Sequence, residues 1–213
     1  MTDLSTHSVR SYLAILLIVA LSTTSCSTAD EPLAARPTPT VAVESEGWSE
    51  AGSSILGAAL RRYESGYEFT SEVVVDEATA ISVEGRQVGT ASHMTIQSGD
   101  GIIEYLIADQ AQWFRTDSGT WDLVTDDAEI GSPLDPLSAP TSVSIADEYD
   151  TTFELNAIYP ASAFNVAADL AVILVIDAGQ LISATYVTNV DGAEATVSTT
   201  FRELTDDTPI AVP

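Results

Sequence analysis

The side chains that most often perform catalysis are scarce in this chain. Its 213 residues include one cysteine, two histidines and no lysine, because all seven basic residues are arginines. Without lysine it can form neither a Schiff base nor a Walker A phosphate loop. A Ser-His-Asp triad would have to use His93, the one histidine beyond the N-terminal segment. Alternating polar and apolar residues surround His93, so we interpret it as a solvent-facing histidine on a strand.

Carboxylates are the abundant chemical group. A pair of carboxylates can hydrolyse a glycosidic bond, and clustered oxygens can bind calcium. The acidic groups 126–127, 147–150 and 206–207 fall in expected loops or turns, where such groups are usually solvated. Zinc is disfavoured because its usual histidine and cysteine ligands are nearly absent. We therefore expect no catalytic residue, no metal site, no cofactor and no enzymatic activity.

The charge balance bears on the partners. There are 32 Asp and Glu against 7 Arg, which gives a formal net charge of −25 at pH 7. Such a surface repels a phosphate backbone, so nucleic acid is excluded as an expected partner, whereas a basic protein partner fits. The 45% content of hydrophobic residues is too high for a disordered acidic chain, so most of it should fold.

The first 25 residues are typical of an export signal. Arg10 precedes an apolar run at 12–21 that is too short to span a membrane, and the small residues 22–25 lead to Cys26. A run of small residues that ends in cysteine resembles the lipobox of bacterial lipoproteins, although Thr23 stands where leucine is usual. This resemblance implies a diacylglyceryl group on Cys26 and an anchor at the extracytoplasmic face of the cell membrane. The alternative is an ordinary signal peptide with an incidental cysteine.

The rest of the chain divides into a tether and one domain. Residues 26–49 are rich in Ser, Thr, Ala, Pro and Glu, which predicts a flexible tether. Helical spacing of apolar residues predicts one amphipathic helix from Glu50, ended by Gly66. Alternation of period two then predicts strands from residue 67 to 124 and again from 151 to 203. Between them, the three prolines of 131–140 predict broken helical turns over 133–149.

We therefore expect residues 50–213 to be an α+β domain. Its curved antiparallel sheet, a half-barrel of about nine to ten strands, would pack on the N-terminal helix and on the short helical insertion. Trp113 and Trp121 flank a turn, so they are expected either as a cross-strand aromatic pair or, in the alternative, as lining of a ligand cavity.

Short motifs along this domain resemble the LppX/LprG type of actinobacterial lipoprotein and, more distantly, the LolA/LolB carriers. The motifs are Ala58–Leu60 with Tyr67–Phe69, Val83–Gly85 with Gly89, Trp113–Arg115 with Gly119–Trp121, Asp135–Pro136, and a closing stretch from Val175 to Pro213. The resemblance implies a sheet that wraps over helices around an apolar cavity. It also implies binding or transport of an acylated lipid or lipoglycan of the cell envelope, with no catalytic residues.

The expected strands carry more apolar positions than one short helix can cover. If the helices leave a pocket over the apolar face of the sheet, the residues of that face would line it. If the helices fill the space, the same residues are core. The candidate ligand-binding residues are Val73, Val75, Ile103, Tyr105, Ile107, Phe153, Leu155, Leu174, Ile176 and Tyr186.

Two functions follow from these patterns. The first is a membrane-anchored, extracytoplasmic protein that binds or carries an acylated lipid. The second is an envelope scaffold whose acidic surface docks basic proteins and which has no lipid ligand.

Overall fold

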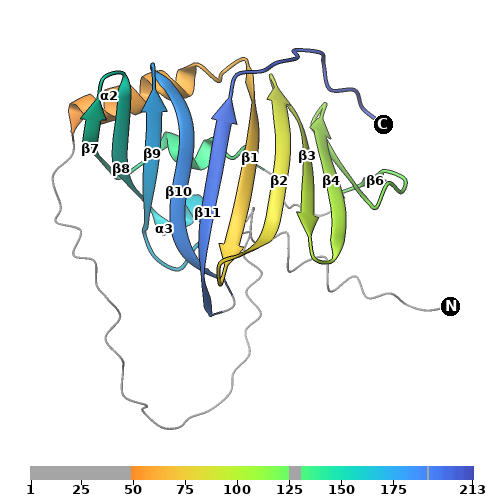
Figure 1. The fold of residues 1–213 in the computed structure, drawn as a ribbon. Coiled ribbons are helices and arrows are strands. Elements are labelled where there is room, and N and C mark those ends of the chain that lie inside the picture. Colours follow the sequence, from red (N-terminus) through yellow and green to blue (C-terminus); the bar gives the residue numbers. More distant parts are fainter. Residues whose placement is uncertain (1–48, 125–130, 191) are drawn as a thin grey trace, which may run out of the picture.

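One antiparallel sheet makes up most of the molecule (Figure 1). The computed structural model describes residues 49–124, 131–190 and 192–213. Within them the sheet has eleven strands in the order β6-β5-β4-β3-β2-β1-β11-β10-β9-β8-β7, with β6 and β7 at its two edges. The strands are β1 (Gly66–Val75), β2 (Ala78–Val88), β3 (Ala91–Ser98), β4 (Gly101–Ala108), β5 (Ala111–Thr116), β6 (Asp122–Leu123), β7 (Ser142–Tyr149), β8 (Thr152–Tyr159), β9 (Leu170–Asp177), β10 (Gln180–Val190) and β11 (Ala193–Arg202).

Two-residue turns join most neighbouring strands. Val75 pairs with Ala78 across the first turn, Val88 with Ala91 across the second, and Ala108 with Ala111 across the fourth. Asp76 and Glu77 both have positive φ, at 50° and 65°, and Asp109 and Gln110 repeat this at 51° and 64°. Positive φ at both turn positions is the geometry that matches the twist of a hairpin, and Asp tolerates it better than most residues.

The strands form two meanders, β1–β6 and β7–β11, which the pairing of β1 with β11 joins. Phe69 lies opposite Phe201 and Val73 opposite Val197. Between these apolar pairs, the buried Thr199 hydroxyl donates a hydrogen bond to Ser71 Oγ at 3.0 Å. A buried hydroxyl pair of this kind avoids the cost of an unsatisfied polar group at the centre of the sheet.

Helix α2 (Glu50–Arg61) forms where the helical spacing predicts it. Ser49 is its N-cap, because its Oγ accepts a hydrogen bond from Gly52 N at 3.1 Å. The helix buries Leu56 and Ala59, and it packs on β7 and β10. Just beyond it, the hydroxyl of buried Tyr63 donates to the Leu181 carbonyl at 2.7 Å, which ties the end of the helix to β10.

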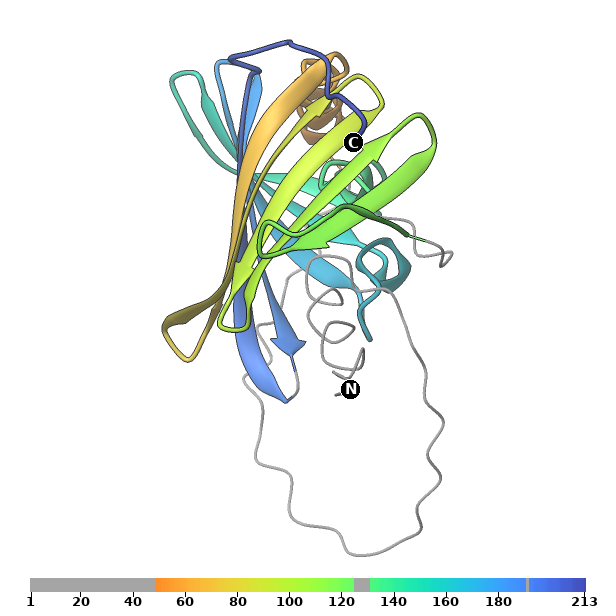
Figure 2. The ribbon, with the colours of Figure 1, turned by 90° about the vertical axis from the view of Figure 1, so that its right-hand side faces the viewer.

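The helical elements of the described residues lie on one face of the curved sheet (Figure 2). They are α2, the 3-10 helix η1 (Asp135–Ser138) and the four-residue α3 (Ala161–Phe164). Figure 1 shows all three behind β7–β10. We call the face that they cover the inner face and the opposite one the outer face.

The predicted fold class was wrong. Eleven strands lie in one sheet with two separate edges, so the described residues form a mainly β structure and not an α+β half-barrel of nine to ten strands. The prolines of 131–140 do give a helical turn at η1, but the expected helical turns at 141–149 are replaced by β7. There Val143 and Ile145 alternate with serines, and Val143 is fully buried against the inner face, which a strand achieves and a proline-broken helix does not.

Gly85 on β2 provides a test of packing at the sheet centre. A Cβ at this position would lie 2.5 Å from the ring of Phe69, which is only 3% exposed and cannot move away. We expect Gly85→Ala to lower the free energy of unfolding by about 1–3 kcal/mol, as overpacking does. Gly57→Ala, in the middle of α2 with its nearest contact at 3.5 Å, should raise it by about 0.5–1 kcal/mol. Urea unfolding of both variants checks this, and equal effects would contradict it.

Candidate functional site

The ten candidate residues lie together on the inner face. Met94 on β3 is paired with Tyr105 on β4, and Tyr105 with Phe114 on β5. In the other meander Tyr186 is paired with Val172, and Leu174 with Leu155. All ten belong to one hydrophobic cluster or pack against it.

Burial divides these residues into two groups. Val73, Leu155, Leu174 and Ile176 have no exposed surface, and Tyr105 has 4%. Residues packed this closely are core, and a ligand could not reach them without opening the protein. The partly exposed group, which a ligand could contact, consists of Val75, Ile103, Ile107, Phe153 and Tyr186.

The inner face is filled over β7–β10. Phe164 of α3 packs edge-on against Tyr159 and Tyr186, with ring centroids 5.4 and 5.2 Å apart. The Tyr159 hydroxyl donates to the Leu137 carbonyl of η1 at 3.2 Å. Burial raises the pKa of Tyr186 to about 12, so its hydroxyl stays neutral at all physiological pH values. This half of the face therefore has the character of a packed core.

The β2–β5 half of the inner face differs. No helix of the described residues packs on it to the extent that α2 packs on β7 and β10. Tyr105 stacks on Phe114 at 6.2 Å, and the partly exposed Ile103 and Ile107 flank Tyr105 on β4. Gln112, opposite Ile107, has a buried Oε1 that accepts no hydrogen bond in the described part of the chain. A buried unsatisfied acceptor beside an apolar surface is a feature that a ligand or an ordered water would satisfy.

A cleft of about 290 Å³ opens at the end of this face, between the end of α2, the start of β1 and η1. Tyr67 lies in it and hydrogen bonds to Ser132 Oγ at 2.5 Å and to Gln87 Oε1 at 3.1 Å. Burial raises the pKa of Tyr67, so the hydroxyl remains a neutral hydrogen-bonding group. Arg61, Glu64 and Asp135 line the rim, so the cleft offers neutral polar groups inside and mixed charges outside.

The outer face carries an aligned row of polar and apolar side chains. Cross-strand pairing places Arg202, Glu68, Arg86, His93 and Leu106 side by side on β11, β1, β2, β3 and β4. We call this the outer row. The C-terminal segment, residues 203–213, starts at the Glu68 end of the row: Glu68 Oε1 accepts hydrogen bonds from Thr205 Oγ1 at 2.6 Å and from Thr205 N at 3.2 Å. These bonds, with those from Arg202, hold the pKa of Glu68 below its ordinary value.

Glu104 is the centre of a second cluster beside the row. Its carboxylate accepts two hydrogen bonds from Arg115, at 2.9 and 2.8 Å, and lies 3.2 Å from His93 Nε2. The Arg115 guanidinium stacks over the Trp121 ring at 4.6 Å, so a planar cation is held between a carboxylate and an indole. The hydrogen bonds from Arg115 are the main cause of a lowered pKa for Glu104.

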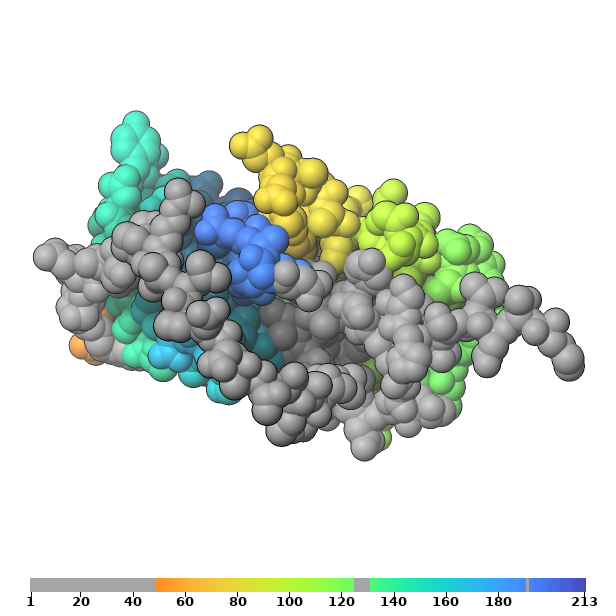
Figure 3. All heavy atoms as spheres, turned by 90° about the horizontal axis from the view of Figure 1, so that it is seen from below, coloured from red at the N-terminus to blue at the C-terminus, as the bar shows by residue number. Residues whose placement is uncertain are grey.

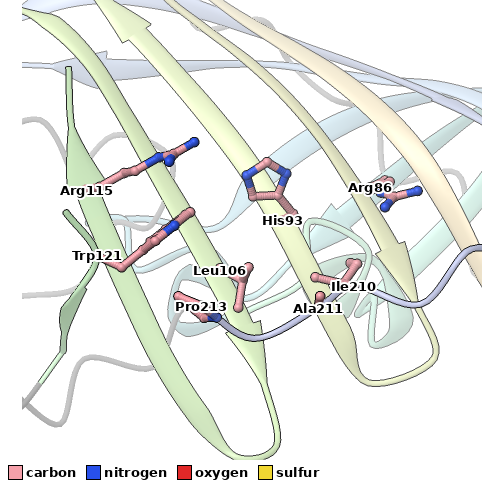
Figure 4. Close-up of a pocket in the computed structure, with 8 residues that line it drawn as sticks. All are labelled: Arg86, His93, Leu106, Arg115, Trp121, Ile210, Ala211 and Pro213. Atoms are coloured by element: carbon pink, nitrogen blue, oxygen red, sulfur yellow. The ribbon is translucent and has the colours of Figure 1, made fainter. Parts of the chain in front are cut away.

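The C-terminal segment and these side chains line an open cleft of about 260 Å³ (Figure 4). Its lining consists of Arg86, His93, Leu106, Arg115, Trp121, Ile210, Ala211 and Pro213. Figure 4 shows His93 between the two guanidinium groups, with Ile210, Ala211 and Pro213 along one side. We call it the outer cleft.

The outer cleft was not predicted from the sequence, although the strand alternation and the turn positions indicate part of it. Alternation places Arg86, His93 and Arg115 on the solvent side of successive strands. The two-residue turns at 89–90 and 109–110 then set Arg86 opposite His93 and Glu104 opposite Arg115. Counting residues outward from each turn predicts both cross-strand pairs, Arg86 with His93 and Glu104 with Arg115. The crossing of the C-terminal segment has no comparable local signal.

His93 and the tryptophans can now be placed. His93 lies on the outer face of β3 with 35% of its side chain exposed, in agreement with its interpretation as a solvent-facing strand residue. Trp113 and Trp121 are not cross-strand partners, because Trp113 is paired with Leu123 and Trp121 packs on Arg115 and His93. Trp121 therefore lines a cleft, on the outer face.

Other predicted features fall partly outside the described residues. Cys26, the export signal 1–25, nearly all of the tether 26–49 and the pair 126–127 belong to this group. In the described ranges, no three His, Cys, Asp or Glu side chains come together in a way that could hold a metal ion. Neither α2 nor α3 is long and apolar enough to cross a membrane.

Comparisons with known proteins do not assign a family to this chain. No family model matches the chain. No curated protein matches it either. One solved structure that resembles it is a DUF1329 family protein from Desulfovibrio piger, with a TM-score of 0.37 and 10% identity over 76% of this chain and 94% of that one. A likeness of this size assigns neither a family nor a function, so the LppX/LprG resemblance continues to rest on the sequence motifs alone.

The Glu104 cluster predicts a pH dependence of stability. A carboxylate whose pKa is lowered by folding stabilises the protein above its ordinary pKa of 4.5, and this contribution is lost as the pH falls through the folded value. We expect Glu104→Gln to lower the free energy of unfolding by roughly 1–2 kcal/mol at pH 7, and the difference to shrink below pH 4.5. Urea unfolding from pH 3 to 8 measures this. Glu72→Gln, which removes the same charge at an exposed position of β1, is the control. A loss at pH 7 that persists unchanged at pH 3 would contradict the ion-pair origin.

Proposed function

We propose that this protein is a lipid-anchored, extracytoplasmic binding protein that holds the acyl chain of a cell-envelope lipid without covalent chemistry. The anchor is a diacylglyceryl group on Cys26, and residues 26–49 separate the sheet from the membrane. The binding surface is the β4–β5 part of the inner face, with Ile103 and Ile107 as contact residues.

One observation carries this proposal: the two halves of the inner face are covered unequally. Over β7–β10 the described helices and the ring of Phe164 fill the space. Over β4 and β5 the apolar positions Ile103, Ile107 and Phe114 are partly exposed, and the unsatisfied Gln112 acceptor lies beside them. The inner-face residues of β2 and β3 are buried, as Ile81, Val83, Met94 and Ile96 show. Covering apolar surface stabilises a complex by about 25 cal/mol for each Å² removed from water, so an acyl chain is a favourable occupant.

The polar cleft at the end of the inner face fits the head of such a lipid. Tyr67, Gln87 and Ser132 offer hydroxyl and amide groups, and Glu64 and Asp135 outnumber Arg61 among the charged lining residues. With a net charge of −25 on the chain, an anionic headgroup would be repelled. The expected ligand is therefore an acylated lipid whose head is uncharged or zwitterionic.

The anchor predicts a specific intact mass. The protein isolated from membranes of a lipoprotein-processing bacterium should begin at Cys26 and carry the added mass of a diacylglyceryl group, because the small residues 22–25 and the cysteine resemble a lipobox. A Cys26→Ser variant should be recovered without detergent and without acyl mass. A wild-type product that starts elsewhere and lacks acyl mass would disprove the anchor.

The binding surface predicts co-purifying lipid. The Cys26→Ser chain, analysed by native mass spectrometry, should retain about one acylated lipid, which organic extraction releases. Ile103→Gln should lower this occupancy about fivefold or more, because burial of an unpaired amide costs about 1–3 kcal/mol.

A neighbouring residue supplies the matched control. Ile102 precedes Ile103 on β4 but is 42% exposed on the outer face, so Ile102→Gln should leave the occupancy unchanged. If the parent chain is free of lipid, or if both glutamine variants act alike, the inner face is not the binding surface.

A second function is supported by a different observation. Two acidic hairpin tips project from the outer side of the sheet (Figure 2). One is Asp76–Glu77 at the β1–β2 turn, and the other consists of Asp147 and Glu148 at the end of β7 with Asp150 in the turn that follows. The β1–β2 tip also stands out when the molecule is seen from below (Figure 3). Such projections suit docking of a basic protein, in which case the chain is an envelope scaffold. Pull-downs with the Asp76→Asn/Glu77→Gln variant separate the two functions, because this variant should lose a salt-sensitive protein partner and keep the lipid.

A further inference from the structure

We propose that the outer cleft binds a small organic acid, a monoanionic carboxylate attached to a flat apolar body, and that the ligand carboxylate competes with Asp206 of the chain itself for Arg86. This site is separate from the inner face and does not depend on the lipid-binding function.

The charges of the cleft are unusual for this chain. The described part of the chain contains only five arginines and one histidine. Three of these six residues, Arg86, Arg115 and His93, line the outer cleft. Arg115 is already paired twice with Glu104 and stacked on Trp121, so its position is fixed. Arg86 is held much less firmly, since its Nη1 lies 3.4 Å from both the backbone oxygen and Oδ2 of Asp206. Arg86 is therefore the cation that can exchange partners.

Asp206 is well placed to be displaced. Its side chain is 59% exposed, and an exposed ion pair at 3.4 Å contributes little to stability. Its Oδ1 accepts hydrogen bonds from Thr208 N and Thr208 Oγ1, at 2.9 and 2.5 Å, so its turn persists without Arg86. A ligand carboxylate can thus replace Asp206 at Arg86 without unfolding the segment.

The lining defines the class of ligand. Trp121 and Leu106 supply a flat aromatic and an aliphatic surface, and Ile210 and Pro213 supply apolar contacts from the C-terminal segment. A volume of about 260 Å³ is at or below the lower end of ordinary small-molecule sites, roughly 300–1,000 Å³, which limits the ligand to about one ring and its acid group. A single negative charge replaces that of Asp206, whereas a dianionic phosphate would add uncompensated charge beside Glu104.

Benzoate is a suitable probe, with neutral benzamide as its isostere. In the Cys26→Ser chain, benzoate should shift the NMR signal of the Trp121 indole N–H, assigned by replacing Trp48 and Trp113 with phenylalanine, and benzamide should not. Arg86→Gln should weaken benzoate binding about tenfold or more, because it removes a charge-assisted hydrogen bond.

Asp206→Asn gives a test that loss of folding cannot imitate. Asparagine keeps the Oδ1 acceptor for Thr208 but removes the competing charge, so benzoate should bind roughly two- to fivefold more tightly, as expected for the loss of one exposed ion pair. Asp207→Asn removes the same charge one residue away and should not reproduce the full gain. Equal binding of benzoate and benzamide, no shift at Trp121, or equal effects of the Asp206 and Asp207 variants would each overturn the proposal.

Discussion

The pairing of β1 with β11 is the interaction on which the rest of the structure depends. It joins residues 66–75 to residues 193–202 and makes one eleven-stranded sheet from two meanders. The outer row and the inner core both cross this junction. The outer row runs from Arg202 across Glu68 to Arg86, and the inner core runs from Phe201 and Val197 to Phe69 and Val73.

The separation of the two faces follows from strand geometry. Side chains alternate along each strand, so the residue beside an inner apolar position always belongs to the outer surface. Tyr105 and Glu104 illustrate this, since one is in the core and the other pairs with Arg115. The tight turns protect the arrangement, because a slip of one residue would exchange the faces and bury the charged side chains.

The few arginines of this acidic chain act as links between distant segments. Arg62 pairs with Glu203, Arg86 with Asp206 and Arg202 with Glu68, and all three contacts involve the C-terminal segment or the strand before it. With a net charge of −25, repulsion would drive such a segment away from the sheet unless cations held it. One of these arginines, Arg86, also lines the outer cleft, so the contact that holds the C-terminal segment lies beside the candidate acid site.

The local sequence pattern was enough to predict most helices and strands and to show which apolar residues share the inner face. Helix α2, most strands and the common face of the ten apolar residues follow from periodicity and from two-residue turns, which act over a few residues. The prolines of 131–140 predicted broken helical turns over 133–149, whereas the alternation of serines with Val143 and Ile145 forms β7. It also could not tell which of the ten residues are core and which are accessible.

Three features were decided by the tertiary structure alone. They are the β1–β11 junction, the position of the helices over β7–β10, and the path of residues 203–213 across the outer row. Each brings together residues far apart in the sequence, and its stability depends on surfaces that exist only once the sheet has formed. The chain composition by itself determined the acidity, the absence of lysine chemistry and the single cysteine, because these properties do not depend on conformation.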